Sequence, residues 1–200
     1  MNGQFSKKAT ALLSTAAMLL SCADFSALDF SVHAEDDNFP KLTAYDVNGN
    51  GEMEDGEEAY PLDSVDDLYW FADKVNNDYD NYGDANAFLT KDITVNSGVL
   101  DENGELNSDT SNFKAWINCD SQWYQGTFDG AGYTISGLYS NDSVAAYVGL
   151  FGLNIGTIKN VSVTDSYFCG NGYVGGVCGY CKGTIENCSN TGKVEGYYSG

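Results

Sequence analysis

Apolar residues in the second half of the chain occur in short stretches that glycine interrupts, without helical spacing. One such unit, 152–162, returns 27 positions later as 179–189. The residues that recur unchanged are Gly152, Gly156, Thr157, Ile158, Asn160 and Ser162, which reappear as Gly179, Gly183, Thr184, Ile185, Asn187 and Ser189. Self-similarity at such a period is typical of stacked repeats that cannot bury an apolar face alone. The pattern predicts an all-β fold, a parallel β-solenoid of short strands joined by tight corners.

The repeat also predicts which side chains stack inside the solenoid. Segment 134–138 matches 157–161 at a spacing of 23 residues. We therefore expect two inward columns, the first formed by Ile135, Ile158 and Ile185 and the second by Leu138, Val161 and Cys188. Asn160 and Asn187 share another position of the repeat, where stacked side-chain amides can satisfy backbone groups at a corner.

The clearest helical pattern covers 64–76. Ser64 can cap the helix, and acidic residues in the first turn favour the helix dipole. One apolar stripe recurs at helical spacing and contains Val65, Leu68, Tyr69, Ala72 and Val75. We expect this helix to cover the N-terminal end of a solenoid that begins near Phe88. The alternative is a carbohydrate-stacking platform at Trp70.

The first 34 residues have the pattern of a secretory signal peptide. Two lysines precede an apolar run over 9–20, which is too short to span a bilayer, and 32–34 provides a small-residue cleavage pattern. A second interpretation is a lipoprotein, because 19–22 resembles a lipobox with Cys22 as the lipidated residue. Both interpretations predict an exported mature chain without a transmembrane helix.

Charge and composition exclude several classes of function. The 200 residues carry 29 acidic and nine basic side chains, all lysine, for a formal charge of −20. Such a surface repels phosphate backbones, so we expect no nucleic-acid partner, whereas it favours divalent cations or solubility in a salty exterior. The single histidine, His33, falls in the predicted signal peptide. Ser-His-Asp and Cys-His catalysis, and zinc held by histidine, are therefore not expected in the mature chain.

An acidic, turn-rich leader over 35–60 contains a pattern for calcium binding. Segment 46–57 matches D-x-[DN]-x-[DN]-G-x₅-E in full. The expected oxygen donors are Asp46, Asn48, Asn50, the carbonyl of Glu52, and Glu57. Pro40 and Pro61 leave little room for flanking helices, so the alternative is a solvated linker. A lone loop would bind Ca²⁺ weakly, with a Kd on the order of 10⁻⁴–10⁻³ M.

The remaining reactive side chains have structural explanations as well as chemical ones. The five cysteines after residue 34 fit buried thiols, one disulfide, or a zinc site built around Cys178-x-x-Cys181. Two carboxylates at glycosidase spacing are also conceivable, and the available ones are Asp120, Asp129, Asp142 and Asp165. Each of these occurs in a turn-like context, so we expect no catalytic residues in this chain.

The segments 126–138, 148–152 and 156–161 together resemble the GLUG-repeat proteins, which are named for a Gly-Leu-apolar-Gly core, here Gly149 to Gly152. The resemblance covers about 60–200 and implies a right-handed parallel β-helix in a secreted or surface protein of bacteria. It is unspecific as to activity. The second copy of the core, 175–179, departs from the motif by one extra residue.

These observations predict a signal peptide over 1–34, the acidic leader over 35–60, and over 61–200 the first part of a β-helix domain that continues beyond Gly200. The leading hypothesis is a non-catalytic secreted or cell-surface module for adhesion or spacing, with host or cell-wall glycans or proteins as partners and Ca²⁺ as the only cofactor. The alternatives are the non-catalytic leader of an IgA-protease-type surface peptidase and a carbohydrate-active β-helix.

Overall fold

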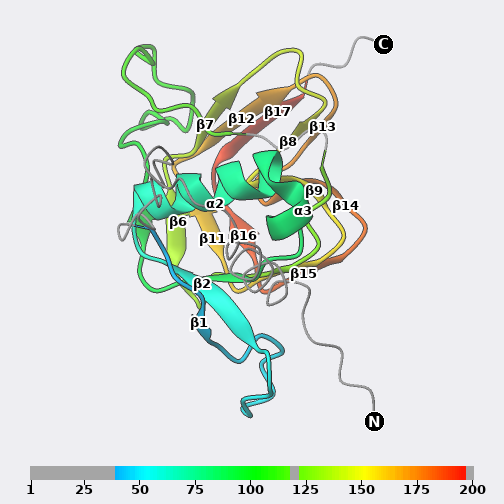
Figure 1. The fold of residues 1–200 in the computed structure, drawn as a ribbon. Coiled ribbons are helices and arrows are strands. Elements are labelled where there is room, and N and C mark those ends of the chain that lie inside the picture. Colours follow the sequence, from blue (N-terminus) through cyan, green and yellow to red (C-terminus); the bar gives the residue numbers. More distant parts are fainter. Residues whose placement is uncertain (1–38, 118–121, 197–200) are drawn as a thin grey trace, which may run out of the picture. The chain divides into compact units, whose positions relative to one another are not determined.

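The structure is a computed structural model that describes residues 39–117 and 122–196, which belong to the compact unit Asn38–Gly200. Short strands dominate it, and its helices are α2 (Val65–Asn77) and the four-residue α3 (Tyr79–Tyr82) (Figure 1). The prediction of a β-rich fold is confirmed. The predicted signal peptide, Cys119 and Asp120 lie outside the described residues.

The strands form five sheets. The first contains, in spatial order, β1 (Thr43–Ala44), β2 (Glu58–Leu62), β3 (Ala87–Leu89), β5 (Thr127–Asp129), β10 (Thr157–Lys159) and β15 (Thr184–Glu186). The second contains β4 (Ile93–Thr94), β6 (Thr134–Ser136), β11 (Ser162–Thr164) and β16 (Ser189–Asn190). The third contains β7 (Tyr139–Asn141), β12 (Tyr167–Gly170) and β17 (Lys193–Gly196). The last two pair β8 (Tyr147–Val148) with β13 (Tyr173–Val174), and β9 (Phe151–Asn154) with β14 (Cys178–Cys181).

Successive segments of the chain visit these sheets in the same order. Residues 127–154 supply β5 to β9, residues 157–181 supply β10 to β14, and residues 184–196 supply β15 to β17. We call each segment a coil. Every named strand from β2 onwards pairs in parallel, and the antiparallel pair among the named strands is β1 with β2. The 27-residue repeat is confirmed, because Ile158 lies opposite Ile185.

The predicted inward columns are only partly right. Ile158 lies between Phe128 and Ile185, whereas Ile135 lies opposite Val163 in the neighbouring sheet. The match of 134–138 to 157–161 suggested the wrong sheet for Ile135. A strand followed by a corner occurs several times within each coil, so sequence similarity alone does not show to which sheet a strand belongs. Val161 and Cys188 do occupy equivalent positions in successive coils, because the residues on both sides of them pair in register. Leu138 instead donates its backbone N–H to Ser166 Oγ at 2.9 Å.

The predicted asparagine ladder is present. Asn160 and Asn187 both have positive φ values, 54° and 51°, which asparagine tolerates better than most residues at a tight corner. The Asn187 amide donates to Asn160 Oδ1 at 3.2 Å, and the Asn160 amide donates to Asp129 Oδ1 at 3.0 Å. The ladder therefore ends on the Asp129 carboxylate.

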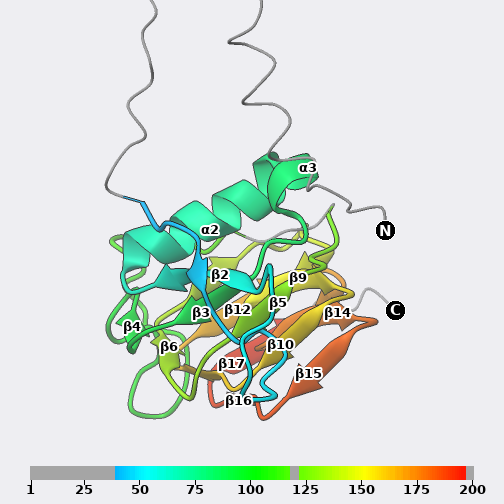
Figure 2. The ribbon, with the colours of Figure 1, turned by 60° about the horizontal axis from the view of Figure 1, so that its bottom comes forward.

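Helix α2 matches the predicted segment 64–76 within one residue at each end. The Ser64 hydroxyl accepts the N–H of Asp67 at 3.1 Å, so the predicted N-cap is confirmed. Leu68, Phe71 and Val75 are buried, and α2 lies across the end of the stack that β2 and β3 begin, away from β15 (Figure 2). The expected start of the sheet near Phe88 is wrong, because β2 already pairs with β3.

Candidate functional site

The predicted calcium segment is the loop of a β-hairpin. Strands β1 and β2 pair antiparallel, with Thr43 opposite Ala59 and Ala44 opposite Glu58. The Tyr45 N–H then donates to the Glu57 carbonyl at 3.2 Å and closes the loop. We call residues 45–57 the hairpin loop. Its ends are fixed by the sheet, so it differs from the solvated linker that was the alternative interpretation.

Side-chain oxygens of the predicted ligands converge on the backbone of the hairpin loop. The two Asp46 oxygens accept from the N–H groups of Gly49 and Gly51, each at 2.7 Å. The side chains of Asn48 and Asn50 each accept an N–H two residues on, at 2.8 and 2.7 Å. Glu57 accepts from the N–H groups of Asn48 at 3.3 Å and Glu54 at 3.1 Å. Four of the five predicted donors therefore hydrogen-bond to the backbone of the same loop.

The fifth predicted donor is the Glu52 carbonyl, and it stays a prediction. The contact seen at this residue is its backbone N–H, which donates to Asn50 Oδ1. Gly51, at the predicted sharp turn, has a φ of 85°, where a side chain would be strained. In residues 39–117 and 122–196, no group of three or more His, Cys, Asp or Glu side chains is arranged to hold a metal ion. The loop offers oxygen atoms of asparagine and of carboxylates, which are the kinds of ligand that Ca²⁺ takes in proteins.

A half-buried polar cluster around the buried Asp129 joins the hairpin loop to the coils. Lys159 Nζ on β10 donates to the Val47 carbonyl at 2.9 Å and lies 3.4 Å from Asp129 Oδ2 on β5. The Tyr45 hydroxyl donates to Asp129 Oδ2 at 3.0 Å, and Asn160 completes the group. We call Tyr45, Asp129, Lys159 and Asn160 the Asp129 cluster. Sequence reasoning did not identify Tyr45 or Lys159, because nothing local in the sequence relates them to the loop.

The electrostatics of the Asp129 cluster favour an ionised carboxylate. Burial opposes the charged form of Asp129, but hydrogen bonds from Asn160, the Ala131 N–H and Tyr45, with the Lys159 ammonium, hold the pKa of this carboxyl below its usual value. Burial, together with the neighbouring Asp129 carboxylate, raises the pKa of the Tyr45 hydroxyl well above its usual value. Asp129 thus accepts hydrogen bonds and balances the Lys159 charge.

The other described carboxylates proposed for catalysis also have structural partners. Asp142 accepts the N–H of Val144 at 3.0 Å in a turn. Asp165 accepts the N–H groups of Gly98 and Leu100, each at 2.9 Å, and so holds the start of the 97–117 segment against the coil. These contacts give both side chains a role in the fold.

The four described cysteines are free thiols. Cys169 is buried, and Cys178, Cys181 and Cys188 are half-buried. Burial, with Cys181 close by, raises the pKa of the Cys178 thiol to about 12, so this sulfur is protonated at neutral pH. Nucleophilic attack needs the thiolate. The protonated Cys178 sulfur is therefore a poor nucleophile, and the free thiols of Cys178 and Cys181 fit the thiol interpretation.

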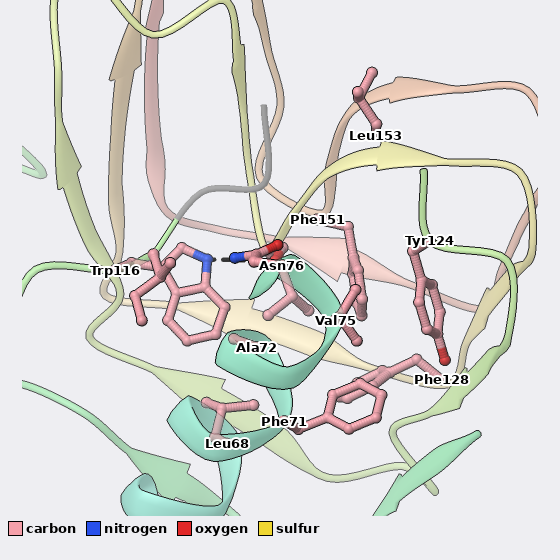
Figure 3. Close-up of a pocket in the computed structure, with 12 residues that line it drawn as sticks. Leu68, Phe71, Ala72, Val75, Asn76, Trp116, Tyr124, Phe128, Phe151 and Leu153 are labelled. Carbon is pink, nitrogen blue, oxygen red and sulfur yellow. Dashed lines mark hydrogen bonds between the residues drawn. The ribbon is translucent and has the colours of Figure 1, made fainter. Parts of the chain in front are cut away.

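Aromatic side chains fill the interface between α2 and the coils. Leu68, Phe71 and Val75 of α2 face the side chains of Trp116 and Phe128 in Figure 3. A cavity of about 30 Å³ lies between them. Trp70 packs against Phe39, Tyr60 and Tyr82, which argues against an open stacking platform at this residue.

A second aromatic group lies on the surface and was not identified from the sequence. Tyr147 and Tyr173 occupy equivalent positions on β8 and β13, and their rings stack with centroids 5.5 Å apart. Tyr180 contacts both rings and Trp123, and Lys182 Nζ lies 4.7 Å from the Trp123 ring centroid. Tyr173 is 56 % exposed. We call Trp123, Tyr147, Tyr173 and Tyr180 the aromatic ladder.

Comparison with known proteins identifies the repeat. Residues 170–195, which run from the end of β12 to β17, match the family model described as the GLUG motif. This part of the chain carries a GLUG motif. The predicted resemblance is thereby confirmed, including for the coil whose glycine core carries an extra residue.

The chain is also similar to halomucin of Haloquadratum walsbyi, with 33 % identity over 162 residues. The match covers 78 % of this chain but only 2 % of the length of that protein. No solved structure matches. Within the described residues, no helix has the length and apolar character needed to cross a membrane. The motif and the relative together indicate a surface or extracellular repeat protein.

Proposed function

We propose that this chain is a non-catalytic module of a bacterial secreted or cell-surface protein, built as a right-handed parallel β-helix and used for adhesion or spacing. The parallel pairing of successive coils in five sheets supports the β-helix, and the GLUG motif supports the surface location. Coils stacked in register form a stiff body, because each strand is hydrogen-bonded to the equivalent strand of the next coil. Such a body suits the separation of a binding surface from the cell.

The observation that carries the adhesion part of this proposal is the aromatic ladder. Large aromatic side chains with polar tips are enriched at binding surfaces. Here several of them occupy one surface region, and Tyr173 remains more than half exposed. The adjacent Lys182 adds a hydrogen-bond donor in a strongly acidic chain. These groups fit a glycan or a glycoprotein that offers both flat apolar faces and acceptor oxygens.

Solid-phase binding tests the adhesion proposal. The labelled chain is applied to immobilised peptidoglycan, a mucin glycoprotein and a collagen matrix, and binding is compared with that of Tyr173→Ala. We expect the variant to bind roughly 5-fold more weakly to the recognised surface. Tyr133→Ala is the matched control, because Tyr133 is also exposed but lies outside the ladder. Absence of binding to all three surfaces, or equal losses in both variants, would contradict adhesion through the ladder.

The second part of the proposal is that the hairpin loop binds Ca²⁺. What supports this function is that Asp46, Asn48, Asn50 and Glu57 all lie in one closed loop and their side-chain oxygens accept from its backbone N–H groups. The calcium-bound loop would stay attached to the coils through Lys159, which donates to the Val47 carbonyl. Occupancy would then stiffen the hairpin against the sheet. In an exterior with millimolar Ca²⁺, even a Kd on the order of 10⁻⁴–10⁻³ M is sufficient.

Calorimetry with Ca²⁺ tests the loop directly. We expect the chain to release binding heat at millimolar Ca²⁺ and the double variant Asp46→Ala/Glu57→Gln to release none. The control Asp80→Ala/Glu102→Gln removes the same charges from exposed positions outside the loop. Equal heats from the chain and the loop variant would assign the binding to general surface charge. Circular dichroism checks that both variants keep the fold.

A further inference from the structure

The hairpin loop and the 97–117 segment contain the same tripeptide, Asn-Gly-Glu, at 50–52 and at 103–105. Every residue of both copies is exposed. An asparagine followed by glycine can react with its own backbone, because glycine has no side chain to obstruct the close approach of the two groups. The two copies have the same local chemistry, so a difference in their reactivity in the folded chain must come from their surroundings.

The hairpin loop surrounds Asn50 with groups that favour such a reaction. The Gly51 N–H donates to Asp46 Oδ2 at 2.7 Å, so a carboxylate lies where it can accept the proton of that nitrogen. The Glu52 N–H donates to Asn50 Oδ1 at 2.7 Å, so a donor is in place to stabilise negative charge on that oxygen. The Asn50 amide nitrogen donates to Glu54 Oε1 at 3.4 Å. A nucleophile, a base and a polarised carbonyl therefore meet in one exposed turn.

The second copy of the tripeptide has different partners. The Gly104 N–H donates to the backbone carbonyl of Asp101 at 3.0 Å, and a neutral carbonyl is a much weaker base than a carboxylate. The Glu105 N–H donates to Asp101 Oδ1 at 3.0 Å, rather than to the side chain of Asn103. In the contacts that the structure describes, Asn103 thus has neither the base nor the polarising donor that Asn50 has.

We propose that Asn50 is a site of self-modification, at which the Gly51 nitrogen attacks the side-chain carbonyl carbon of Asn50 and ammonia is released. The new N–C bond forms as the Gly51 proton passes to Asp46. The bond from that carbon to the side-chain nitrogen then breaks, and the nitrogen takes up a proton and leaves as ammonia. Water opens the resulting cyclic imide to give aspartate or isoaspartate. The reaction consumes water alone and needs no oxidant or reductant.

Asn48 has a matching arrangement in the same loop. Its glycine neighbour, Gly49, donates its N–H to Asp46 Oδ1 at 2.7 Å, and Asn48 Oδ1 accepts the N–H of Asn50 at 2.8 Å. Each modification replaces a neutral amide with a carboxylate and so adds negative charge to a loop of a chain whose formal charge is already −20. Because ammonia is lost, the change accumulates with the age of the molecule. It requires no bound cation and is independent of the calcium proposal.

Peptide mapping by mass spectrometry tests the proposal, because it measures the conversion of each asparagine to aspartate or isoaspartate over time. The chain is incubated at neutral pH with a chelator, so that no cation competes for Asp46. We expect Asn50 to react roughly 10-fold or more faster than Asn103. In concentrated urea the two rates should converge, because the contacts are lost while the tripeptide stays the same. A folded chain in which Asn50 reacts no faster than Asn103 overturns the proposal.

The variant Asp46→Asn tests the base. It keeps an oxygen that can accept the Gly51 N–H but removes the carboxylate, so the rate at Asn50 should fall roughly 10-fold, towards that of Asn103. The control Glu58→Gln removes the same charge from an exposed position beside the loop, and it should leave the rate unchanged. Circular dichroism checks that both variants are folded. An Asn50 rate that is unchanged or higher in Asp46→Asn, or equally lowered in both variants, overturns the role of Asp46 and with it the proposal.

Discussion

The coil stack and the hairpin loop are neighbours joined through Lys159, yet different interactions hold them. In the stack, Phe128, Ile158 and Val163 are fully buried, and the coils depend on continuous apolar columns. The hairpin loop is mostly exposed, and hydrogen bonds from its own backbone to Asp46 and Glu57 shape it. The stack should therefore be sensitive to the volume and polarity of single side chains, and the loop to the charge of its oxygen donors.

The largest effect should come from a charge placed in the stack. Ile158→Asp buries an unpaired carboxylate between Phe128 and Ile185, which should cost about 4 kcal/mol or more and unfold the coils. Thermal melting followed by circular dichroism measures the loss. Ile155→Asp is the matched control, because Ile155 is 44 % exposed and should tolerate the change. A wild-type melting temperature for Ile158→Asp would show that the column is wrongly assigned.

A smaller loss is expected at the covered end of the stack. Phe71→Ala removes the ring that packs 6.1 Å from Tyr124 and 6.4 Å from Phe128, centroid to centroid, and leaves a cavity beneath α2. Such truncations cost about 3–5 kcal/mol. Urea denaturation gives the free energy of unfolding of the variant. Phe39→Ala deletes the same side chain at a partly exposed position, and a loss there as large as at Phe71 would contradict a special role for the helix contact.

The smallest effect on stability should come from Asp129, and it should affect the hairpin more than the stack. Asp129→Asn removes the charge that faces Lys159 and Tyr45, with an expected loss of roughly 1–3 kcal/mol at neutral pH. Hydrogen exchange of β1 and β2 should accelerate more than that of β11 and β12. Asp142→Asn, at an exposed turn, serves as the control. Uniform acceleration in all four strands would mean that Asp129 supports the stack rather than the link.

The stability lost in Asp129→Asn should also depend on pH. The pKa of folded Asp129 is lowered, so its contribution is complete above the pKa of the unfolded carboxyl, about 3.9, and is lost as the pH falls through the lower folded value. The stability difference between the chain and Asp129→Asn should be constant from about pH 6 to 8 and shrink below about pH 4. Chemical denaturation at these pH values measures it, and a difference that grows on acidification would contradict the lowered pKa.

The sequence by itself determined those features that depend on neighbouring residues. The helix near 64–76 follows from its apolar stripe and the Ser64 cap, and the 27-residue repeat follows from glycine, isoleucine and asparagine at fixed positions. The stacking of Asn160 and Asn187 follows from the same period. The loop residues Asp46 to Glu57 were also identified locally, because a turn-forming loop is specified by its own side chains and glycines.

Only the tertiary structure decided to which coil and sheet each predicted strand belongs. Segment 134–138 has the same strand-and-corner pattern as 157–161, and the lengths of the intervening corners assign it to another sheet, opposite Val163. The contact of Lys159 with Val47 spans 112 residues, and Tyr45 reaches Asp129 across 84. No periodicity along the chain encodes such contacts, because they arise when β2 adds to the edge of β3 and carries the hairpin beside β10. Local patterns specify the elements of this protein, whereas the order in which strands stack brings the Asp129 cluster together.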